Sequence, residues 1–304
     1  MEIGSDKHEA RAVMRYVYDV RFGLTTADVC AGRLDELSAD DKAELERIKK
    51  RLAEGEPVQY AIGRAAFGGR LFGVSRGVFI PRPETEELCE WVINDYRPVS
   101  LTRRDTGGEP LAVLDLCTGS GCIAVTIALS LPGARVTACD ISDKALSAAR
   151  TNAARLGADI EIVKTDVLLP PAVEAGSDNC KPGLHEDCGA RTEPTNSQSS
   201  GKYDVFVSNP PYICLKESAD MERNVLDYEP HEALFVPDDN PLLFYRAIAR
   251  RAAHGLKSGG NMYLEVNPLY VSSVKEMLST TGFATIETRR DFCGKERFVK
   301  ATRQ

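Results

Sequence analysis

The chain has 304 residues, 43% of them hydrophobic and 27% charged, which is ordinary for a globular protein of one large or two modest domains. The net charge is −7 and the sequence pI is about 5.3. This balance argues against broad, sequence-independent nucleic-acid binding, because such binding needs a basic face. We therefore expect no stable nucleic-acid partner.

Nothing at the start of the chain resembles a signal peptide, since residues 1–9 are polar and charged. No apolar run approaches the length of a membrane span. The nine cysteines are odd in number and include no Cys-x-x-Cys pair, so we expect reduced thiols. The protein is predicted to be soluble and cytoplasmic, with no membrane contact.

Residues 1–56 predict a small helical domain. Apolar residues recur at helical spacing between Ala10 and Val20. Ser38 and the aspartates that follow predict the start of another helix, which continues to Leu52. Nothing in this domain suggests catalysis, so we expect it to bind a partner.

Residues 57–80 predict a β-hairpin linker, because apolar residues flank the glycine pair at 68–69. A helix is expected to start in the run from Pro81 to Leu88, whose first turn is acidic. The polar stretch 97–110 predicts a surface loop.

Strands and helices alternate from residue 111 onward. Strands are predicted at 111–116, 134–139 and 159–163, with helices at 123–131 and 143–156 between them. This alternation indicates a parallel sheet with helices on its faces. The stretch 172–202 predicts a flexible insertion. Its Cys180, His185 and Cys188 supply only three candidate zinc ligands, so we expect no metal site.

The rest of the chain predicts a strand at 203–207 and a long polar loop at 213–240 that can cover a site. A helix at 242–256, a strand at 261–266 and a helix at 269–279 follow. Two final strands, 283–288 and 296–301, are expected to close the sheet as an edge hairpin.

A glycine loop follows the first strand of the predicted sheet and opens a helix: Cys117-Thr118-Gly119-Ser120-Gly121. Its glycines allow a ligand to approach the backbone closely, at the amino end of the helix. Asp115, inside the apolar strand, is expected to be a buried structural partner of this loop.

Acidic residues follow the next two strands. Asp140 can accept both ribose hydroxyls of a nucleoside, or else cap the helix that begins near Ser142. Asp166 can accept from an adenine amino group, with Val167 against the ring. The chain lacks the Gly-Lys-Ser/Thr of a phosphate loop and the third glycine of a dinucleotide fold, and its loop matches that of S-adenosylmethionine-dependent methyltransferases.

Asn209-Pro210-Pro211-Tyr212 follows the strand at 203–207. Two consecutive prolines end the strand and stiffen the corner, because neither has an N–H and the second holds the first extended. The Asn209 Oδ1 and the Pro210 carbonyl can accept the two N–H bonds of a planar amide or amino group, and Tyr212 can pack on its face. A strand end with a polyproline turn is the purely structural alternative.

Together these motifs resemble the HemK/PrmC family, the protein-(glutamine-N5) methyltransferases that act on peptide chain release factors. The resemblance covers nearly the whole chain and includes five segments: Glu56 to Tyr60, Phe79 to Glu86, Asp115 to Gly121, Asn209 to Tyr212 and Glu287 to Asp291. Asn-Pro-Pro-Tyr also occurs in DNA adenine methyltransferases. The run Ile-Pro-Arg-Pro-Glu-Thr-Glu is far more specific to this family.

The resemblance implies a class I methyltransferase at residues 81–304, with a Rossmann-like, mostly parallel sheet and a closing antiparallel hairpin. It implies methyl transfer from S-adenosyl-L-methionine to the side-chain amide nitrogen of the glutamine in the Gly-Gly-Gln motif of class I peptide chain release factors. The predicted cofactor residues are Cys117, Thr118, Gly119, Ser120, Gly121, Asp140, Asp166, Val167 and Asn209. The predicted substrate residues are Asn209, Pro210, Pro211 and Tyr212, with Asn209 and Pro210 catalytic.

Two departures from the family pattern matter. Cys117 stands where the family has a glycine, and we expect the loop to survive if this position does not need a positive φ. The insertion 172–202 is longer than the family needs. Two other functions stay open, an amino-group methyltransferase of nucleic acids and a non-catalytic scaffold. The low pI counts against the first, and the intact Asp140 and Asn209 against the second.

Overall fold

The computed structural model describes residues 7–170 and 202–304. The predicted insertion, except Lys202, and its Cys180, His185 and Cys188 lie outside the described residues. The α-helices are α1 (Lys7–Phe22), α2 (Thr26–Cys30), α3 (Ala39–Ala53), α4 (Val58–Ile62), α5 (Pro83–Thr106), α6 (Cys122–Ser130), α7 (Asp143–Leu156), α8 (Arg223–Tyr228), α9 (Leu243–Gly255) and α10 (Val271–Ser279). The strands are β1 (Arg64–Phe67), β2 (Arg70–Gly73), β3 (Ala112–Leu116), β4 (Arg135–Asp140), β5 (Glu161–Lys164), β6 (Tyr203–Ser208), β7 (Ile213–Cys214), β8 (Phe235–Val236), β9 (Leu256–Glu265), β10 (Phe283–Arg290) and β11 (Glu296–Arg303).

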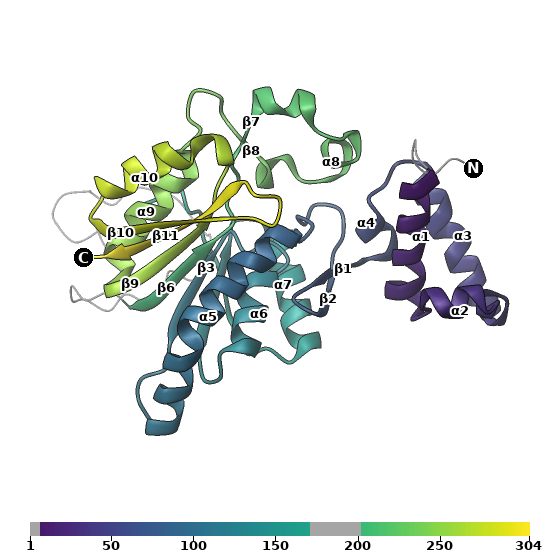
Figure 1. Ribbon diagram of the computed structural model, residues 1–304, viewed down its shortest axis with the longest axis horizontal. Helices are drawn as coiled ribbons and strands as arrows, with labels where there is room; N and C mark the ends of the chain where they lie inside the picture. Colours follow the sequence, from purple (N-terminus) through teal and green to yellow (C-terminus); the bar gives the residue numbers. More distant parts are fainter. Residues whose placement is uncertain (1–6, 171–201) are drawn as a thin grey trace, which may run out of the picture.

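The amino-terminal helices form their own small core. Val17 of α1 and Ile48 of α3 are buried there together with Ala61 and Ile62 of α4. The start of α3 is as predicted, because the Ser38 side chain accepts from the backbone N–H of Asp41. Figure 1 shows this helical part beside the sheet, connected to it through the β1–β2 hairpin.

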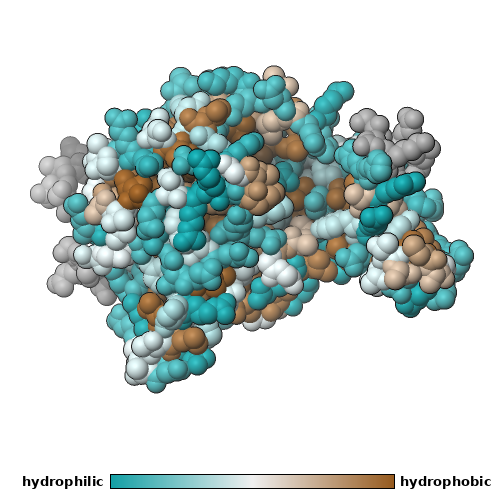
Figure 2. Space-filling model, in the orientation of Figure 1, coloured by the Kyte–Doolittle hydropathy of each residue, from teal (hydrophilic) through white to brown (hydrophobic). Residues whose placement is uncertain are grey.

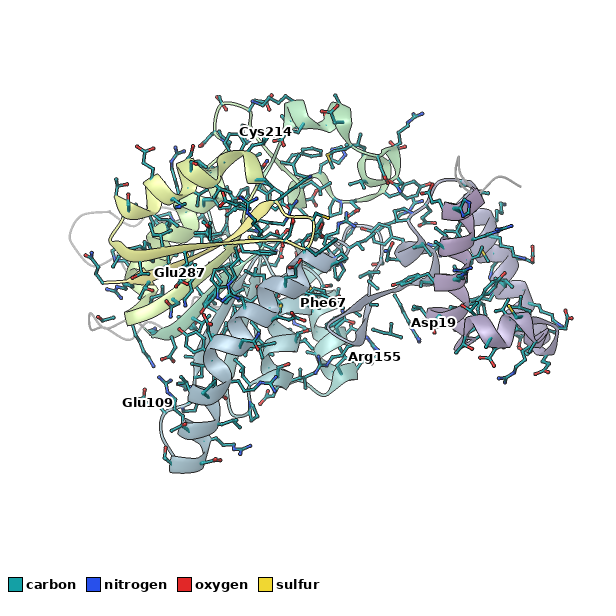
Figure 3. All side chains as sticks on the ribbon, in the orientation of Figure 1. Asp19, Phe67, Glu109, Arg155, Cys214 and Glu287 are labelled. Atoms are coloured by element: carbon teal, nitrogen blue, oxygen red, sulfur yellow. The ribbon has the colours of Figure 1, made fainter. Side chains whose placement is uncertain are left out.

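The hairpin packs on the sheet domain through α7. The Asn152 amide bonds both backbone groups of Gly73, at 2.6 and 3.0 Å, and also the carbonyl of Ser120. Arg155 donates to the carbonyl of Leu71. Phe67 and Arg155 mark this contact in Figure 3, between the helical part and the sheet.

A seven-stranded sheet forms the main domain, in the order β10-β11-β9-β6-β3-β4-β5. Strands β9, β6, β3, β4 and β5 are parallel, and β11 pairs antiparallel with both β9 and β10. The predicted mostly parallel sheet with a closing edge hairpin is confirmed. The chain runs from β3 outward to β5 and then returns to the other side of β3 as β6. Ligands bind at such a switch point, outside the carboxyl ends of the strands.

Helices cover both faces of the sheet (Figure 1). Alternate residues of β3 and β6 point to opposite faces. Val113, Val205 and Val207 pack with α5, α6 and α7, whereas Leu114, Leu116 and Phe206 pack with α9 and α10. Both faces of these strands are therefore buried, which is why the strands are continuous apolar runs in the sequence.

The prediction of a loop at 97–110 is wrong for most of that segment, because α5 continues to Thr106 and contains Pro98. The proline lacks the N–H that would bond to the carbonyl of Asn94. Both residues are exposed, so water can satisfy that carbonyl. The helix ends before Gly107, whose φ is 69°.

Two further predictions need correction. The segment 213–240 is not a plain loop, since β7 pairs with β8 and α8 lies between them. Only a few of its apolar side chains are buried, Cys214, Leu234 and Val236 among them, too few to give a periodic pattern. Strand β9 begins at Leu256 rather than 261, because residues 257–260 belong to the strand and lie at an irregularity in its pairing with β6.

On the face that Figure 2 shows, hydrophilic residues dominate and hydrophobic ones lie in small, separate patches. Within residues 7–170 and 202–304, no helix is both long and apolar enough to cross a membrane.

Candidate active site

A cavity of about 270 Å³ lies at the carboxyl ends of β3, β4, β5 and β6. Nearly all predicted site residues line it: Cys117, Thr118, Gly119, Ser120, Asp140, Asp166, Val167, Asn209 and Pro211. The three others, Gly121, Pro210 and Tyr212, are not part of the wall. The cavity wall is mostly apolar, with a few convergent polar groups, as expected of a small-molecule site.

The loop after β3 alternates in backbone handedness. Cys117, Gly119 and Gly121 have φ of 60°, 57° and 81°. The Cys117 position therefore does require a positive φ, and the loop forms although a cysteine occupies it. Among the described residues, Cys117 is the one non-glycine with positive φ. This conformation costs an L-residue roughly 1–2 kcal/mol, which the surrounding structure has to offset.

Asp115 is a buried structural partner of this loop, as predicted. Its Oδ2 accepts from the Thr118 hydroxyl at 2.6 Å and from the Ala124 N–H at 3.1 Å, at the start of α6. The side chain has no solvent exposure, and this burial raises the pKa of Asp115 to about 7. The carboxyl group therefore acts through the loop and not on a ligand directly.

Gly121 does not line the cavity and instead allows close packing of two helices. A Cβ at this position would lie 3.0 Å from the Cβ and 3.1 Å from the Cα of Ala149, so only glycine lets α6 start this close to α7. Its contact with a cofactor stays a prediction.

Asp140 connects two backbone segments at the end of β4. Its Oδ2 accepts from Gly119 N–H and its Oδ1 from Ser142 N–H, both at 2.9 Å. Helix α7 is capped by the Ser142 side chain and not by Asp140, which rules out the cap alternative. Burial raises the pKa of Asp140, while the backbone bonds from Ser142 and Gly119 oppose that shift. Each carboxylate oxygen keeps a lone pair for a ligand hydroxyl in the cavity.

The loop that carries Asp166 and Val167 is fixed from outside the cavity. Arg251 of α9, only 9% exposed, donates to the carbonyls of Asp166, Val167 and Leu169 at 2.8, 3.1 and 2.9 Å. The Asp166 carboxylate also accepts from Leu168 N–H. Sequence reasoning missed Arg251, because an arginine in an amphipathic helix is normally a surface residue.

Asn209 follows β6 and Asp140 ends β4, so the two residues flank β3 in the sheet, and both line the cavity. The Asn209 Nδ2 donates to the Thr85 Oγ1 at 3.0 Å. The Asn209 Oδ1 takes no part in this bond. The Thr85 hydroxyl donates to Glu265 Oε2 at 2.8 Å, and the Tyr212 hydroxyl donates to Oε1 of the same carboxylate at 3.0 Å. The Tyr212 hydroxyl is thus bonded to the same buried carboxylate as Thr85, and packing of its ring on a substrate stays a prediction.

Glu265, at the end of β9, is 1% exposed. Burial raises the pKa of Glu265 to about 7, although the bonds from Thr85 and Tyr212 and the charge of Arg297 oppose that shift. Sequence reasoning missed Thr85 and Glu265. An acid at the end of an apolar strand was the available signal for Glu265, and the Pro-Glu-Thr-Glu run contains Thr85.

The residues fit the adenosyl part of S-adenosylmethionine. Asp140 offers acceptors to a ribose, and Asp166 and Val167 offer a polar and an apolar contact to a purine. Phe79 and Ile141, which are not among the predicted site residues, add to the apolar wall. Among the described residues, no group of three or more His, Cys, Asp or Glu side chains can hold a metal.

The sheet order, the glycine loop after β3 and the acid after β4 define a Rossmann-like, S-adenosylmethionine-dependent methyltransferase. Residues 113–178 match the family described as Methyltransferase domain, and residues 1–63 match the PrmC N-terminal domain.

Relatives narrow this class. The chain is 36% identical over 295 residues to the release factor glutamine methyltransferase of Bacteroides thetaiotaomicron, covering 97% of this chain and 93% of that protein. It is 37% identical over 255 residues to that of Flavobacterium psychrophilum, covering 84% and 78%. It is 33% identical over 288 residues to the release factor glutamine methyltransferase of Streptococcus pneumoniae, covering 94% of this chain and 89% of that protein. The chain belongs to the release factor glutamine methyltransferase family.

Proposed function

We propose that this enzyme transfers a methyl group from S-adenosyl-L-methionine to the side-chain amide nitrogen of the glutamine in the Gly-Gly-Gln motif of class I peptide chain release factors, in the cytoplasm. The observation that carries the proposal is the Asn209 amide. It is anchored through its nitrogen to Thr85, so its oxygen can accept from a planar N–H₂ group. Asp140 lines the same cavity.

The residues of the chain have mainly a positioning task. An amide nitrogen is a poor nucleophile because its lone pair is delocalised into the carbonyl. S-adenosylmethionine supplies an activated methyl group, so aligning the nitrogen with that methyl lowers the barrier most.

Asn209 and Pro210 then stabilise the change in charge at the nitrogen. As positive charge develops there, its N–H groups become stronger donors. The Oδ1 of Asn209, a residue that lines the cavity, therefore binds the transition state more tightly than the ground state. The same role is proposed for the Pro210 carbonyl, although Pro210 is not part of the cavity wall. No strong general base has to act before methyl transfer.

The helical amino-terminal part is proposed to dock the body of the release factor. The cavity offers only a local pocket for one side chain, and Gly-Gly-Gln by itself is a short sequence. A second contact outside the cavity explains how one glutamine is selected among many.

The test is a methyl-transfer assay with labelled S-adenosylmethionine and a purified class I release factor. We expect label on the intact protein and none when the Gly-Gly-Gln glutamine is changed to alanine. DNA and RNA serve as controls. Label on nucleic acid alone would support the amino-group methyltransferase of nucleic acids instead, and no label on any acceptor would support a scaffold.

A further inference from the structure

We propose that Thr85 and Glu265 are positioning residues that hold the Asn209 side chain with its oxygen toward the substrate amide. This inference rests on the proposed methylation of a glutamine side chain. It assigns a function in that reaction to two buried polar residues, one at the start of α5 and one at the end of β9.

The three side chains form a continuous hydrogen-bonded chain. Asn209 Nδ2 lies 3.0 Å from Thr85 Oγ1, and Thr85 Oγ1 lies 2.8 Å from Glu265 Oε2. Thr85 and Glu265 are 2% and 1% exposed, so water does not compete for these bonds. Thr85 also lines the cavity next to Asn209.

The buried end of the chain sets the direction of every bond. An ionised carboxylate only accepts, so the hydroxyl hydrogens of Thr85 and Tyr212 both point to Glu265. The Thr85 oxygen then has only lone pairs left for Asn209, and only the Nδ2 end of the amide can donate to them. Oδ1 is therefore the end that remains for the substrate.

Protonated Glu265 would no longer fix which group donates and which accepts in these hydrogen bonds. A neutral carboxyl group can donate to Thr85, which frees the Thr85 hydroxyl to donate to Asn209. The Asn209 amide could then turn its nitrogen toward the substrate. Its N–H would face the N–H of the substrate amide, and neither group can accept a hydrogen bond from the other.

Several charged or titratable groups face Glu265. Arg297 of β11 favours the carboxylate, whereas Glu84 of α5 opposes it. Tyr212, Tyr245 of α9 and Cys89 of α5 also lie within its electrostatic reach. Because burial brings the pKa of Glu265 to about 7, protonation falls within an accessible pH range.

The first test compares Thr85→Val with Thr85→Ser. Valine keeps the shape and removes the hydroxyl, so we expect kcat to fall by about 10- to 100-fold while the Kd for S-adenosylmethionine stays the same. Serine restores the hydroxyl and should recover most of kcat. Thr126→Val is the matched control, because the Thr126 hydroxyl is buried with no partner among the described residues. Equal kcat in Thr85→Val and Thr126→Val would overturn the proposal.

The second test uses pH. At saturating S-adenosylmethionine, the kcat of the wild type should fall as pH drops below about 7, because Glu265 becomes protonated. Glu265→Gln should lower kcat and weaken this pH dependence, leaving the contribution of Asp115, whose pKa is also raised to about 7 by burial. Asp204→Asn, at the amino end of β6, is the control and should leave the pH profile unchanged. A Glu265→Gln enzyme with the wild-type kcat and pH profile would contradict the assignment.

A readout without turnover separates this inference from the proposed function. In the ¹⁵N-labelled wild type, the side-chain N–H of Asn209 that bonds to Thr85 should exchange slowly with solvent, and Thr85→Val should accelerate that exchange. Unchanged exchange overturns the positioning chain. Accelerated exchange in an enzyme that never labels a release factor refutes the proposed function and leaves the positioning of Asn209 intact.

Discussion

Asn209 and Cys117 contribute to the site in different ways. Asn209 offers a side-chain oxygen to the cavity, and its nitrogen is held by Thr85. Cys117 matters through its backbone, because its φ of 60° turns the loop toward the cavity. Methyl transfer should therefore depend on the amide of Asn209. The free energy of unfolding should depend on the shape of the side chain at position 117.

Asn209→Ala should abolish methyl transfer to the release factor while the protein stays folded. The variant loses the acceptor that binds the substrate N–H more tightly in the transition state. Single-turnover assays measure the transfer, and circular dichroism checks the fold. Normal turnover would contradict the proposed mechanism.

Substitutions at Cys117 should follow backbone preference. Cys117→Gly should keep the free energy of unfolding within about 1 kcal/mol of the wild type, since relief at positive φ offsets the lost thiol contacts. Cys117→Val should lower it by more than about 2 kcal/mol, because a β-branched side chain is strained there. Urea unfolding measures both. Cys139→Val, the same change in the extended strand β4, should cost less; the reverse order would refute the strain argument.

At the level of elements, the cavity depends on segments that are far apart in the chain. Loops after β3, β4, β5 and β6 form its wall, and α9 fixes one of them through Arg251. The segment between β7 and β8 adds Pro230, Glu232 and Ala233 to the wall. Its Glu229 is buried and pairs with Arg82, just before α5.

Arg251→Met should weaken cofactor binding without preventing folding. The loop at 166–169 loses three hydrogen bonds from a charged donor, so we expect the Kd for S-adenosylmethionine to rise by about tenfold or more. Arg250→Met is the control, because Arg250 is an exposed neighbour on the same helix. Isothermal titration calorimetry measures both variants, and equal Kd values would argue against this role of Arg251.

At the level of the whole molecule, the helical part and the sheet domain are joined by a polar network. Glu56, 5% exposed, accepts from Arg51 of α3 and from Arg76, which follows the hairpin. Arg76 also stacks over the Tyr228 ring at 4.4 Å, and the Tyr228 hydroxyl donates to the backbone carbonyl of Glu54. These contacts connect the proposed docking part to the segment between β7 and β8, which contributes residues to the cavity wall.

Deleting residues 1–53 should raise the KM for the release factor by more than about tenfold, with a far smaller effect on the KM for S-adenosylmethionine. The reason is that docking and cofactor binding use separate parts of the molecule. Tyr228→Phe is the control, since it removes only one bond between the two parts. Equal effects of the deletion on both KM values would argue against docking.

The stability of the molecule should also depend on Glu265. Its folded pKa of about 7 exceeds its ordinary value of 4.5, so between these values the folded state holds a proton that the unfolded state has lost. The contribution of Glu265 to the free energy of unfolding is therefore fully present below pH 4.5. It is lost as pH rises through 7, and the loss is about 3 kcal/mol in total. Glu265→Gln cannot titrate there.

The free energy of unfolding of Glu265→Gln, taken relative to the wild type, should therefore increase by about 3 kcal/mol between pH 4.5 and pH 8. Urea unfolding across this range measures the difference, and other titrating groups cancel in it. A difference that does not change with pH would contradict the raised pKa.

Local patterns in the sequence determined most of the fold. The alternation of apolar strands and amphipathic helices from residue 111 onward predicts the parallel sheet, because each strand and helix shows its own period. The acids and glycines at successive strand ends predict the position of the cavity, since parallel strands bring their carboxyl ends to one edge. The errors lie where polarity or a proline outweighed the periodic signal, as at Pro98 in α5 and in the short elements of 213–240.

Only the tertiary structure decided how the site is held. Thr85 and Glu265 are 180 residues apart, and Arg251 is over 80 residues from the loop that it supports. No local spacing predicts such pairs, because packing of α5 and α9 against the sheet creates them. The sequence therefore determined which groups can meet a methyl donor and an amide. The fold decided which end of the Asn209 amide faces the cavity, because a buried carboxylate that can only accept sets the direction of the hydrogen bonds.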